Sequence, residues 1–174
     1  METTLCLLKK DNSILLAMKK RGFGSGKYNG IGGKIEKGET PDEAMIRETQ
    51  EEIAVTPTNY EKVGIINFDE YYKGNNEHIT LHLYMVYEWK GNPSESEEMK
   101  PKWFDIEKLP FNQMLPDDRY WLPLVLDGKK IKAYFKFDEE WNLLSKEIEK
   151  VQNVIIRKAT IEDIEKIAEI KIEG

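Results

Sequence analysis

The sequence of 174 residues has one cysteine, no long apolar run and no excess of basic residues. Its single cysteine, Cys6, cannot form an internal disulfide, which is typical of a reducing compartment. No apolar run is long enough to cross a bilayer, and the apolar segment at residues 3–8 is too short for a signal peptide. We therefore expect a cytoplasmic protein that does not insert into a membrane.

The chain is acidic, with 26 Lys and Arg residues against 32 Asp and Glu residues and a net charge of −6. Proteins that bind nucleic acid through its phosphates need a clustered basic surface, so we expect no nucleic-acid partner. The acidity still allows a small phosphorylated ligand, because a divalent cation can bridge carboxylates and phosphates. Hydrophobic residues make up 40% of the chain, which is enough for a packed core.

Apolar periodicity and turn residues predict an α/β (α+β) domain over residues 1–138. We expect helices over residues 40–53 and 117–126, and strands over residues 3–9, 13–19, 63–70, 78–89, 102–104 and 130–137. These elements alternate without a regular βαβ repeat, which favours a mixed sheet covered by helices. Residues 139–153 are expected to form a helical linker, and residues 154–174 a separate strand and helix.

The helix at residues 40–53 has clear boundary signals. Thr40 is a suitable N-cap, Pro41 fits the first turn, and Glu43 lies three residues after the cap, as in a capping box. Pro57 prevents the helix from continuing. The preceding segment, residues 21–38, contains seven glycines, so its backbone is expected to approach another group closely or to adopt positive φ.

An acidic cluster lies on one face of this helix, because Glu48, Glu51 and Glu52 are spaced i, i+3 and i+4. The three carboxylates repel one another by roughly 0.2–0.5 kcal/mol per pair. Mg²⁺ prefers such oxygen ligands and also accepts phosphate oxygens, and Arg47 could brace one of the carboxylates. Taken alone, the three glutamates fit an ordinary solvated helix face more readily than a metal site.

The wider pattern changes this interpretation, because residues 33–55 read GKIEKGETPDEAMIRETQEEIAV. This segment resembles the Nudix box, G-x5-E-x7-R-E-U-x-E-E-x-G-U, in which U is a bulky aliphatic residue. Two positions depart from the pattern, since Thr49 replaces an aliphatic residue and Ala54 replaces the closing glycine. Neither departure removes a carboxylate. The matching positions are Gly33, Glu39, Arg47, Glu48, Glu51, Glu52 and Val55.

Segments on both sides of the box extend the resemblance to about residues 3–137. They include MKKRGFGSGKYNGIGGKIEKGET, SEEMKPKWFDIEKLPF and LPDDRYWLPLVL, and they are similar to MutT-type Nudix diphosphatases of oxidised purine nucleoside triphosphates. The resemblance implies the α/β/α sandwich of that superfamily, with a mixed sheet. It also implies hydrolysis of nucleotides such as 8-oxo-dGTP or 2-hydroxy-dATP to the monophosphate and pyrophosphate.

The same resemblance implies a site for Mg²⁺, with Mn²⁺ as a substitute. Glu52 is expected to serve as both ligand and base, and Glu98 is a further candidate for either role. Glu48 and Arg47 complete the implied catalytic residues. The implied metal ligands are the carbonyl of Gly32 and the side chains of Glu48, Glu51, Glu52 and Glu98.

The resemblance also implies that Asn29, Asp117 and Asp118 read the base. Adjacent carboxyls in a half-buried pocket repel each other, so at least one pKa is expected to rise. A protonated carboxyl donates a hydrogen bond and an ionised one accepts it, so the pair could read more than one base. The implied substrate-binding residues are Thr4, Lys19, Phe23, Asn29, Gly33, Lys34, Asp117, Asp118 and Trp121.

Two aromatic positions of the resembled sequences are missing, since Leu115 replaces a stacking tryptophan and Glu70 replaces a second phenylalanine near Phe68. Two alternatives therefore stay open: a Nudix hydrolase of another nucleoside diphosphate derivative, and a nucleotide-sensing domain without catalysis. The oligomeric state is also open.

The tail has a resemblance of its own. Residues 155–170, IIRKATIEDIEKIAEI, are similar to the opening strand and helix of a GNAT-type N-acetyltransferase. The phosphate-binding loop of that family is missing, so no acetyltransferase activity is expected.

Overall fold

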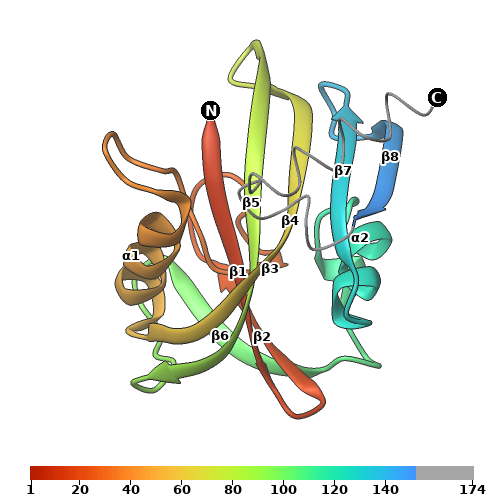
Figure 1. Cartoon of the computed structure of the whole chain (residues 1–174). Coiled ribbons are helices and arrows are strands. Elements are labelled where there is room, and N and C mark those ends of the chain that lie inside the picture. Colours follow the sequence, from red (N-terminus) through yellow and green to blue (C-terminus); the bar gives the residue numbers. More distant parts are fainter. Residues whose placement is uncertain (152–174) are drawn as a thin grey trace, which may run out of the picture.

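The computed structural model describes residues 1–151 (Figure 1). In chain order, the elements are β1 (Glu2–Lys10), β2 (Ser13–Lys19), β3 (Tyr28–Asn29), α1 (Pro41–Ile53), β4 (Thr56–Tyr72), β5 (Asn75–Lys90), β6 (Met99–Asp105), the 3₁₀ turn η1 (Phe111–Gln113), α2 (Asp118–Leu126), β7 (Lys130–Phe137) and β8 (Leu143–Val151). The expected helices and strands are present, and β4 and β5 are longer than the sequence indicates.

The eight strands form one mixed sheet with the order β3-β2-β1-β5-β4-β7-β8, and β6 pairs with β2. The pairs β1–β5 and β4–β7 are parallel, and the other pairs are antiparallel. Helices α1 and α2 lie on opposite sides of this sheet (Figure 1). The expected sandwich with a mixed sheet is therefore confirmed.

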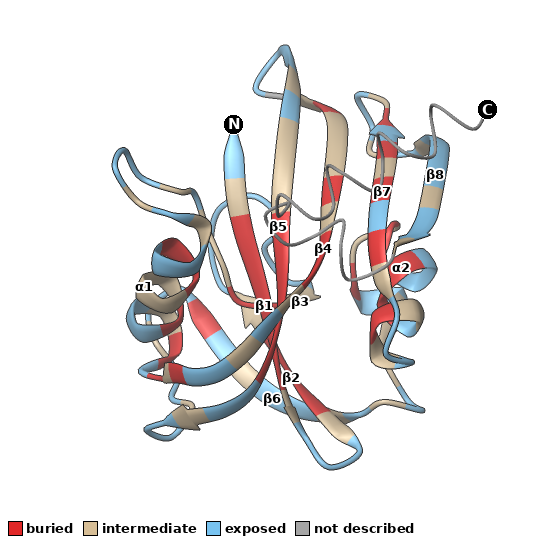
Figure 2. Cartoon of the chain, viewed as in Figure 1, coloured by how far each residue is buried: buried red, intermediate tan, exposed pale blue. Residues whose placement is uncertain are grey.

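The central strand β1 is buried over most of its length (Figure 2), and its buried run of apolar residues supplies both faces. Leu7 belongs to the core cluster that contains Trp121 of α2, whereas its neighbour Leu8 belongs to the cluster that contains Met45 of α1. Successive side chains of a strand point to opposite faces, so one apolar run supplies both cores.

Helix α1 begins and ends as its sequence predicts. The Thr40 side chain accepts a hydrogen bond from the Glu43 N–H at 3.2 Å, and the Thr40 N–H donates to the Glu43 carboxylate at 3.3 Å. The helix ends at Ala54, which adopts the left-handed conformation with φ 59°. Glycine is favoured at such a position, so Ala54 bears the steric cost of its Cβ atom.

The expectation of a helical linker at residues 139–153 is wrong for the described part, residues 139–151. Leu143–Val151 forms β8, which pairs antiparallel with β7 from Phe137↔Leu143 to Lys130↔Val151. The sheet therefore extends beyond residue 138, and β8 adds a largely exposed edge strand. The predicted strand and helix of residues 154–174 lie outside the described residues.

The two α-helices within residues 1–151 lack the length and apolar character needed to cross a membrane.

We expect Ala54→Gly to stabilise the protein by about 0.5–1 kcal/mol, because glycine adopts the left-handed conformation without a Cβ clash. Chemical unfolding in urea measures this change. Ala44→Gly is the matched control inside α1 and should destabilise by about 1 kcal/mol. A loss of stability in Ala54→Gly would contradict the account of the helix end.

Candidate active site

Arg47 connects the acidic face of α1 to the glycine-rich segment before it. Its guanidinium donates hydrogen bonds to Glu39, to Glu48 at 3.0 Å and to Glu51 at 3.1 Å. It also donates to the Lys34 backbone carbonyl at 3.1 Å. Charge-assisted hydrogen bonds are stronger than neutral ones, and arginine presents its donors in a fixed plane. Arg47 therefore fixes the segment 34–39 against the helix that carries the carboxylates.

Gly32 and Gly33 lie where a side chain would not fit. The Thr4 N–H donates to the Gly33 carbonyl at 2.9 Å, so this segment runs beside β1. A Cβ atom at Gly32 would lie 1.8 Å from the Thr4 carbonyl oxygen, and one at Gly33 would lie 2.5 Å from Glu48 Oε1. Glycine at these positions lets the backbone lie directly against the Glu48 carboxylate.

Two carboxyls of α1 have raised pKa values. Burial raises the pKa of Glu52 to about 8, and the negative charges of Glu48 and Glu98 add to the effect. A backbone hydrogen bond from Gly32 and the charge of Lys19 lower it in part. Burial also raises the pKa of Glu48. A carboxyl that titrates near neutral pH can exchange a proton under working conditions, as a general base must.

The acidic face of α1 and the loop before β6 line a cleft of about 290 Å³, which we call the carboxylate cleft. Glu98 in this loop pairs with Arg21 at 3.1 Å. The structure therefore brings the four predicted carboxylates together. Within residues 1–151, no three His, Cys, Asp or Glu side chains are already grouped as metal ligands, and Arg47 holds two of the carboxylates. The lining residues are Arg21, Glu48, Glu51, Glu52, Ser96, Glu97 and Glu98.

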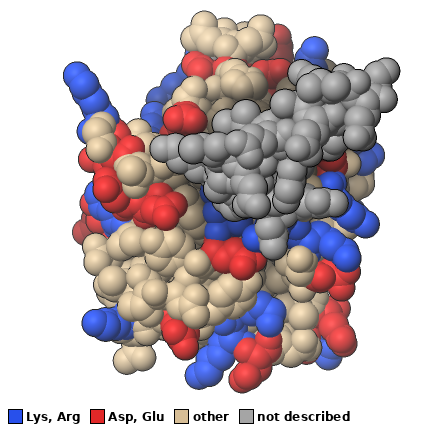
Figure 3. Space-filling model, in the orientation of Figure 1, with Lys and Arg blue, Asp and Glu red and all other residues tan. Residues whose placement is uncertain are grey.

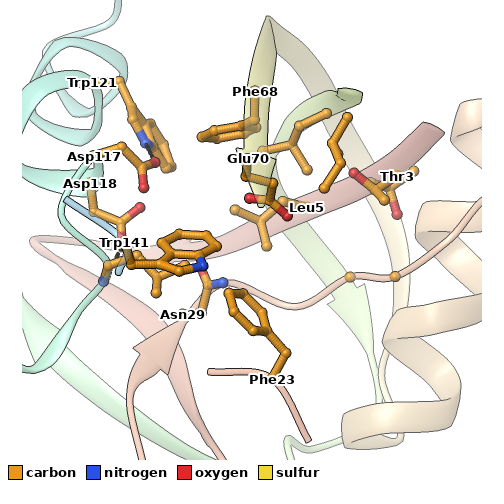
Figure 4. Close-up of a pocket in the computed structure, with 16 residues that line it drawn as sticks. Thr3, Leu5, Phe23, Asn29, Phe68, Glu70, Asp117, Asp118, Trp121 and Trp141 are labelled. Carbon is orange, nitrogen blue, oxygen red and sulfur yellow. Dashed lines mark hydrogen bonds between the residues drawn. The ribbon is translucent and has the colours of Figure 1, made fainter. Parts of the chain in front are cut away.

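A second cavity, of about 230 Å³, lies at the start of α2 (Figure 4). The Trp121 indole N–H donates to Asp117 at 2.8 Å, and the Leu115 backbone N–H donates to Asp118 at 3.1 Å. These bonds hold the two carboxyls in place. The predicted substrate-binding residues that line this cavity are Thr4, Phe23, Asn29, Gly33, Asp117, Asp118 and Trp121. We call it the base pocket, after the sequence-based expectation that these residues bind the base of a nucleotide.

Three carboxyls face the base pocket. Burial raises the pKa of Asp117, and burial together with the neighbouring charge of Asp117 raises that of Asp118, as the sequence predicts. Glu70 of β4 is only 8% exposed, and burial raises its pKa to about 7. Among the described residues that line this pocket there is no Lys, Arg or His. The pocket therefore combines buried acids with no basic partner.

A smaller space of about 140 Å³ lies between the base pocket and the carboxylate cleft. It shares Phe23, Asn29 and Leu115 with the base pocket, and it shares Glu52 with the carboxylate cleft. Lys19 also lines this space. The predicted residues thus line one path from the base pocket to the carboxylates. Lys34 and Arg47 are the exceptions, because neither lines these cavities. The Lys34 side chain is exposed, and its backbone carbonyl accepts a hydrogen bond from Arg47.

Unmet hydrogen bonds also concentrate along this path. Three buried side-chain oxygens within residues 1–151 have no partner, namely Thr4 Oγ1, Glu52 Oε2 and Asp117 Oδ1. Buried polar atoms are nearly always hydrogen-bonded, and an unpaired one costs about 1–3 kcal/mol. All three residues line the path, so a polar ligand would satisfy them.

Sequence reasoning missed several pocket residues, Trp141 among them, and misjudged Glu70. Trp141, in the turn between β7 and β8, lines the base pocket. The only signal was a lone aromatic residue in a polar segment. Glu70 was noted only as a departure from the resembled sequences, although a charged residue between apolar strand positions could have indicated a pocket.

Comparison with known protein families decides which family this chain belongs to. The model of the NUDIX domain matches residues 2–125. The chain belongs to the Nudix hydrolase family. Nudix hydrolases generally use a divalent metal ion. The carboxylate cleft of this Nudix chain offers the oxygen ligands that such an ion prefers.

Curated relatives resemble this Nudix hydrolase over most of their length. The oxidized purine nucleoside triphosphate hydrolase of Danio rerio is 42% identical over 151 residues, which cover 87% of this chain and 96% of the relative. The protein of the same name from Mus musculus is 41% identical over 150 residues, which cover 86% and 95%. The crystal structure of the MutT protein from Bacillus halodurans matches with a TM-score of 0.75 and 26% identity over 85% of this chain and 97% of that one.

The raised pKa of Glu70 predicts a pH-dependent effect of Glu70→Gln. The folded pKa of about 7 exceeds the ordinary value, so the stability linked to this proton is present at low pH and lost as pH rises through 7. Relative to the wild type, Glu70→Gln should therefore gain roughly 1–3 kcal/mol between pH 5 and pH 8. Urea unfolding at both pH values measures the gain. The exposed Glu88→Gln is the control, and an equal pH response of the two variants would contradict the prediction.

Proposed function

We propose that this Nudix protein hydrolyses oxidised purine nucleoside triphosphates to the monophosphate and pyrophosphate. The observation that carries the proposal is the placement of the three unpartnered oxygens, at Glu52 beside the carboxylates and at Thr4 and Asp117 in the base pocket. A nucleotide would extend between these ends, with its base at one and its phosphates at the other. The names of the two vertebrate relatives support the same substrate class.

The base pocket suits a purine whose hydrogen-bonding edge has been altered by oxidation. Burial favours the protonated form of Asp118, which can donate a hydrogen bond, while an ionised Asp117 accepts. The Asn29 amide provides both kinds of group, and its oxygen already accepts from the Gly30 N–H at 2.9 Å. The pocket can therefore match the exchanged donors and acceptors of 8-oxoguanine or 2-hydroxyadenine.

The carboxylate cleft suits Mg²⁺, with Mn²⁺ as a substitute. The ligands would be the Gly32 carbonyl and the side chains of Glu48, Glu51, Glu52 and Glu98. The unpartnered Glu52 oxygen and the mutual repulsion of the glutamates fit a bound cation. Such an ion supplies charge neutralisation of the triphosphate and a bound water of lowered pKa.

The chain's own residues would then position the phosphates and move the proton. Glu52 accepts a proton from the attacking water, since its pKa lies near neutrality in the absence of the cation. Arg47 keeps the carboxylates of Glu48 and Glu51 in position through its hydrogen bonds. Lys19 lies between the two ends of the path, where its ammonium can contact the phosphate chain.

The pocket also favours a second candidate, a Nudix hydrolase of another nucleoside diphosphate derivative. Leu115 and Glu70 both line the base pocket and present an aliphatic and an acidic group to the base. An acidic side chain would favour a base richer in hydrogen-bond donors than 8-oxoguanine.

A panel of nucleotides distinguishes the two candidates. With Mg²⁺ present, 8-oxo-dGTP and 2-hydroxy-dATP should be hydrolysed with a higher kcat/KM than dGTP and dATP, with pyrophosphate as a product. Chromatography of the products measures both points. Equal rates on all four nucleotides would reject the sanitising function, and sugar phosphate from a nucleotide sugar would favour the second candidate.

Glu52→Gln tests the role of the proton acceptor. The amide cannot take up a proton, so kcat should fall by about 10²–10⁴-fold with the preferred nucleotide. Steady-state kinetics measure the change, and the exposed Glu88→Gln is the matched control. Unchanged hydrolysis by Glu52→Gln would remove Glu52 from the proposed mechanism.

The proposal includes a cytoplasmic protein without a nucleic-acid partner. Cys6 is fully buried, and burial raises the pKa of its thiol to about 12, which keeps it protonated and unreactive. On the face shown in Figure 3, basic and acidic side chains are interspersed over the visible described residues. A mixed surface of this kind gives little attraction to a nucleic-acid backbone.

A further inference from the structure

We propose that Trp141 is the ring on which the substrate base stacks, and that it is therefore a specificity-determining residue of the base pocket. The inference deepens the proposed function and rests on it.

The turn between β7 and β8 holds Trp141 over the pocket. The Asp138 side chain accepts hydrogen bonds from the backbone N–H groups of Glu140 and Asn142, both at 2.9 Å. The Trp141 N–H donates to the Asp138 carbonyl at 3.1 Å. The indole extends from this turn toward Asn29 in the pocket (Figure 4). These hydrogen bonds fix the turn, and the turn presents the indole to the pocket.

The backbone of Trp141 is in the left-handed region, with φ 62°. This conformation is unfavourable for a bulky side chain, and such residues cluster at ligand sites where the surroundings hold them. The strained backbone indicates that the position of the indole is maintained despite its cost.

Two neighbouring rings support the indole. Its centroid lies 4.6 Å from that of Phe23, with an interplanar angle of 44°, and 4.7 Å from that of Phe137, with an angle of 28°. Phe137 in turn contacts Phe68 of the pocket at 6.4 Å. Phe23 comes from the loop between β2 and β3, so the ring row joins segments distant in the chain. These contacts support the indole, which remains partly exposed.

Two other lining residues, Leu115 and Trp121, are less suited to stacking. Leu115 has no aromatic face. Trp121 is only 2% exposed, and its N–H is bonded to Asp117, so it positions that carboxyl. Trp141 is partly exposed. Because the carboxyls and Asn29 can bind only the edge of a base, the indole supplies a face for it.

Binding of product nucleotides tests this role separately from catalysis. The probes are 8-oxo-dGMP and dGMP, titrated by calorimetry and by tryptophan fluorescence into wild type, Trp141→Asn and Trp141→Phe. Asparagine tolerates the left-handed conformation, so the turn is retained. Trp103→Phe is the matched control, because Trp103 stacks on Trp89 at 6.0 Å and does not line the base pocket.

We expect Trp141→Asn to weaken 8-oxo-dGMP binding about 10–100-fold, on the scale of base–aromatic stacking. Trp141→Phe should keep most of the affinity and lose most of the fluorescence quenching. In hydrolysis, Trp141→Asn should raise KM by more than it lowers kcat, and Trp103→Phe should match the wild type.

Equal affinities of the wild type and Trp141→Asn, with both folded by circular dichroism, would overturn the role of Trp141 and leave the proposed function standing. Fluorescence quenching that persists in Trp141→Phe and disappears in Trp103→Phe would overturn it as well. If the wild type bound neither nucleotide, the proposed function would fail and this inference with it.

Discussion

The guanidinium of Arg47 is the interaction on which the carboxylate end of the site depends. It bonds to Glu39 before the helix and to Glu48 and Glu51 on it, so one positive charge joins two backbone segments and offsets part of the repulsion among the acids. The geometry also requires glycine, because Gly33 lies against the Glu48 carboxylate. Arg47 and the close contact with Gly33 thus hold the carboxylates of the acidic face in place, unlike those of a freely solvated helix surface.

Burial raises the pKa values of the acids in the base pocket, as it does those of Glu48 and Glu52 on α1. Asp117, Asp118 and Glu70 are desolvated with no basic lining residue among those described, so each carboxyl is shifted toward its protonated form. At both ends of the path the protein therefore holds acids whose charge depends on what binds. The same burial destabilises their ionised forms, so the site retains features that cost stability in the absence of a ligand.

Structural features set by neighbouring residues could be predicted from the sequence, and features set by contacts between distant segments could not. The bounds of α1 follow from Thr40 and Pro41, and the shared face of its glutamates follows from their spacing. The strand at Leu143–Val151 could not be recognised, because its pairing with β7 determines its structure and its own apolar pattern is weak. Asp117 was placed in the site by resemblance alone. Trp141 was missed because a turn was not expected at that point, so nothing in the sequence indicated which way its ring faces.

The parallel pairing of β1 has a consequence for the order of folding. Glu2 pairs with Thr80 and Leu8 with Val86, so the first strand finds its central neighbour only after almost half of the chain has been made. Contacts between such distant segments form slowly, and an early apolar strand without its partner is prone to association with other chains. During synthesis, residues 2–10 can therefore pair with β2 at once but lack their central partner until β5 has been made.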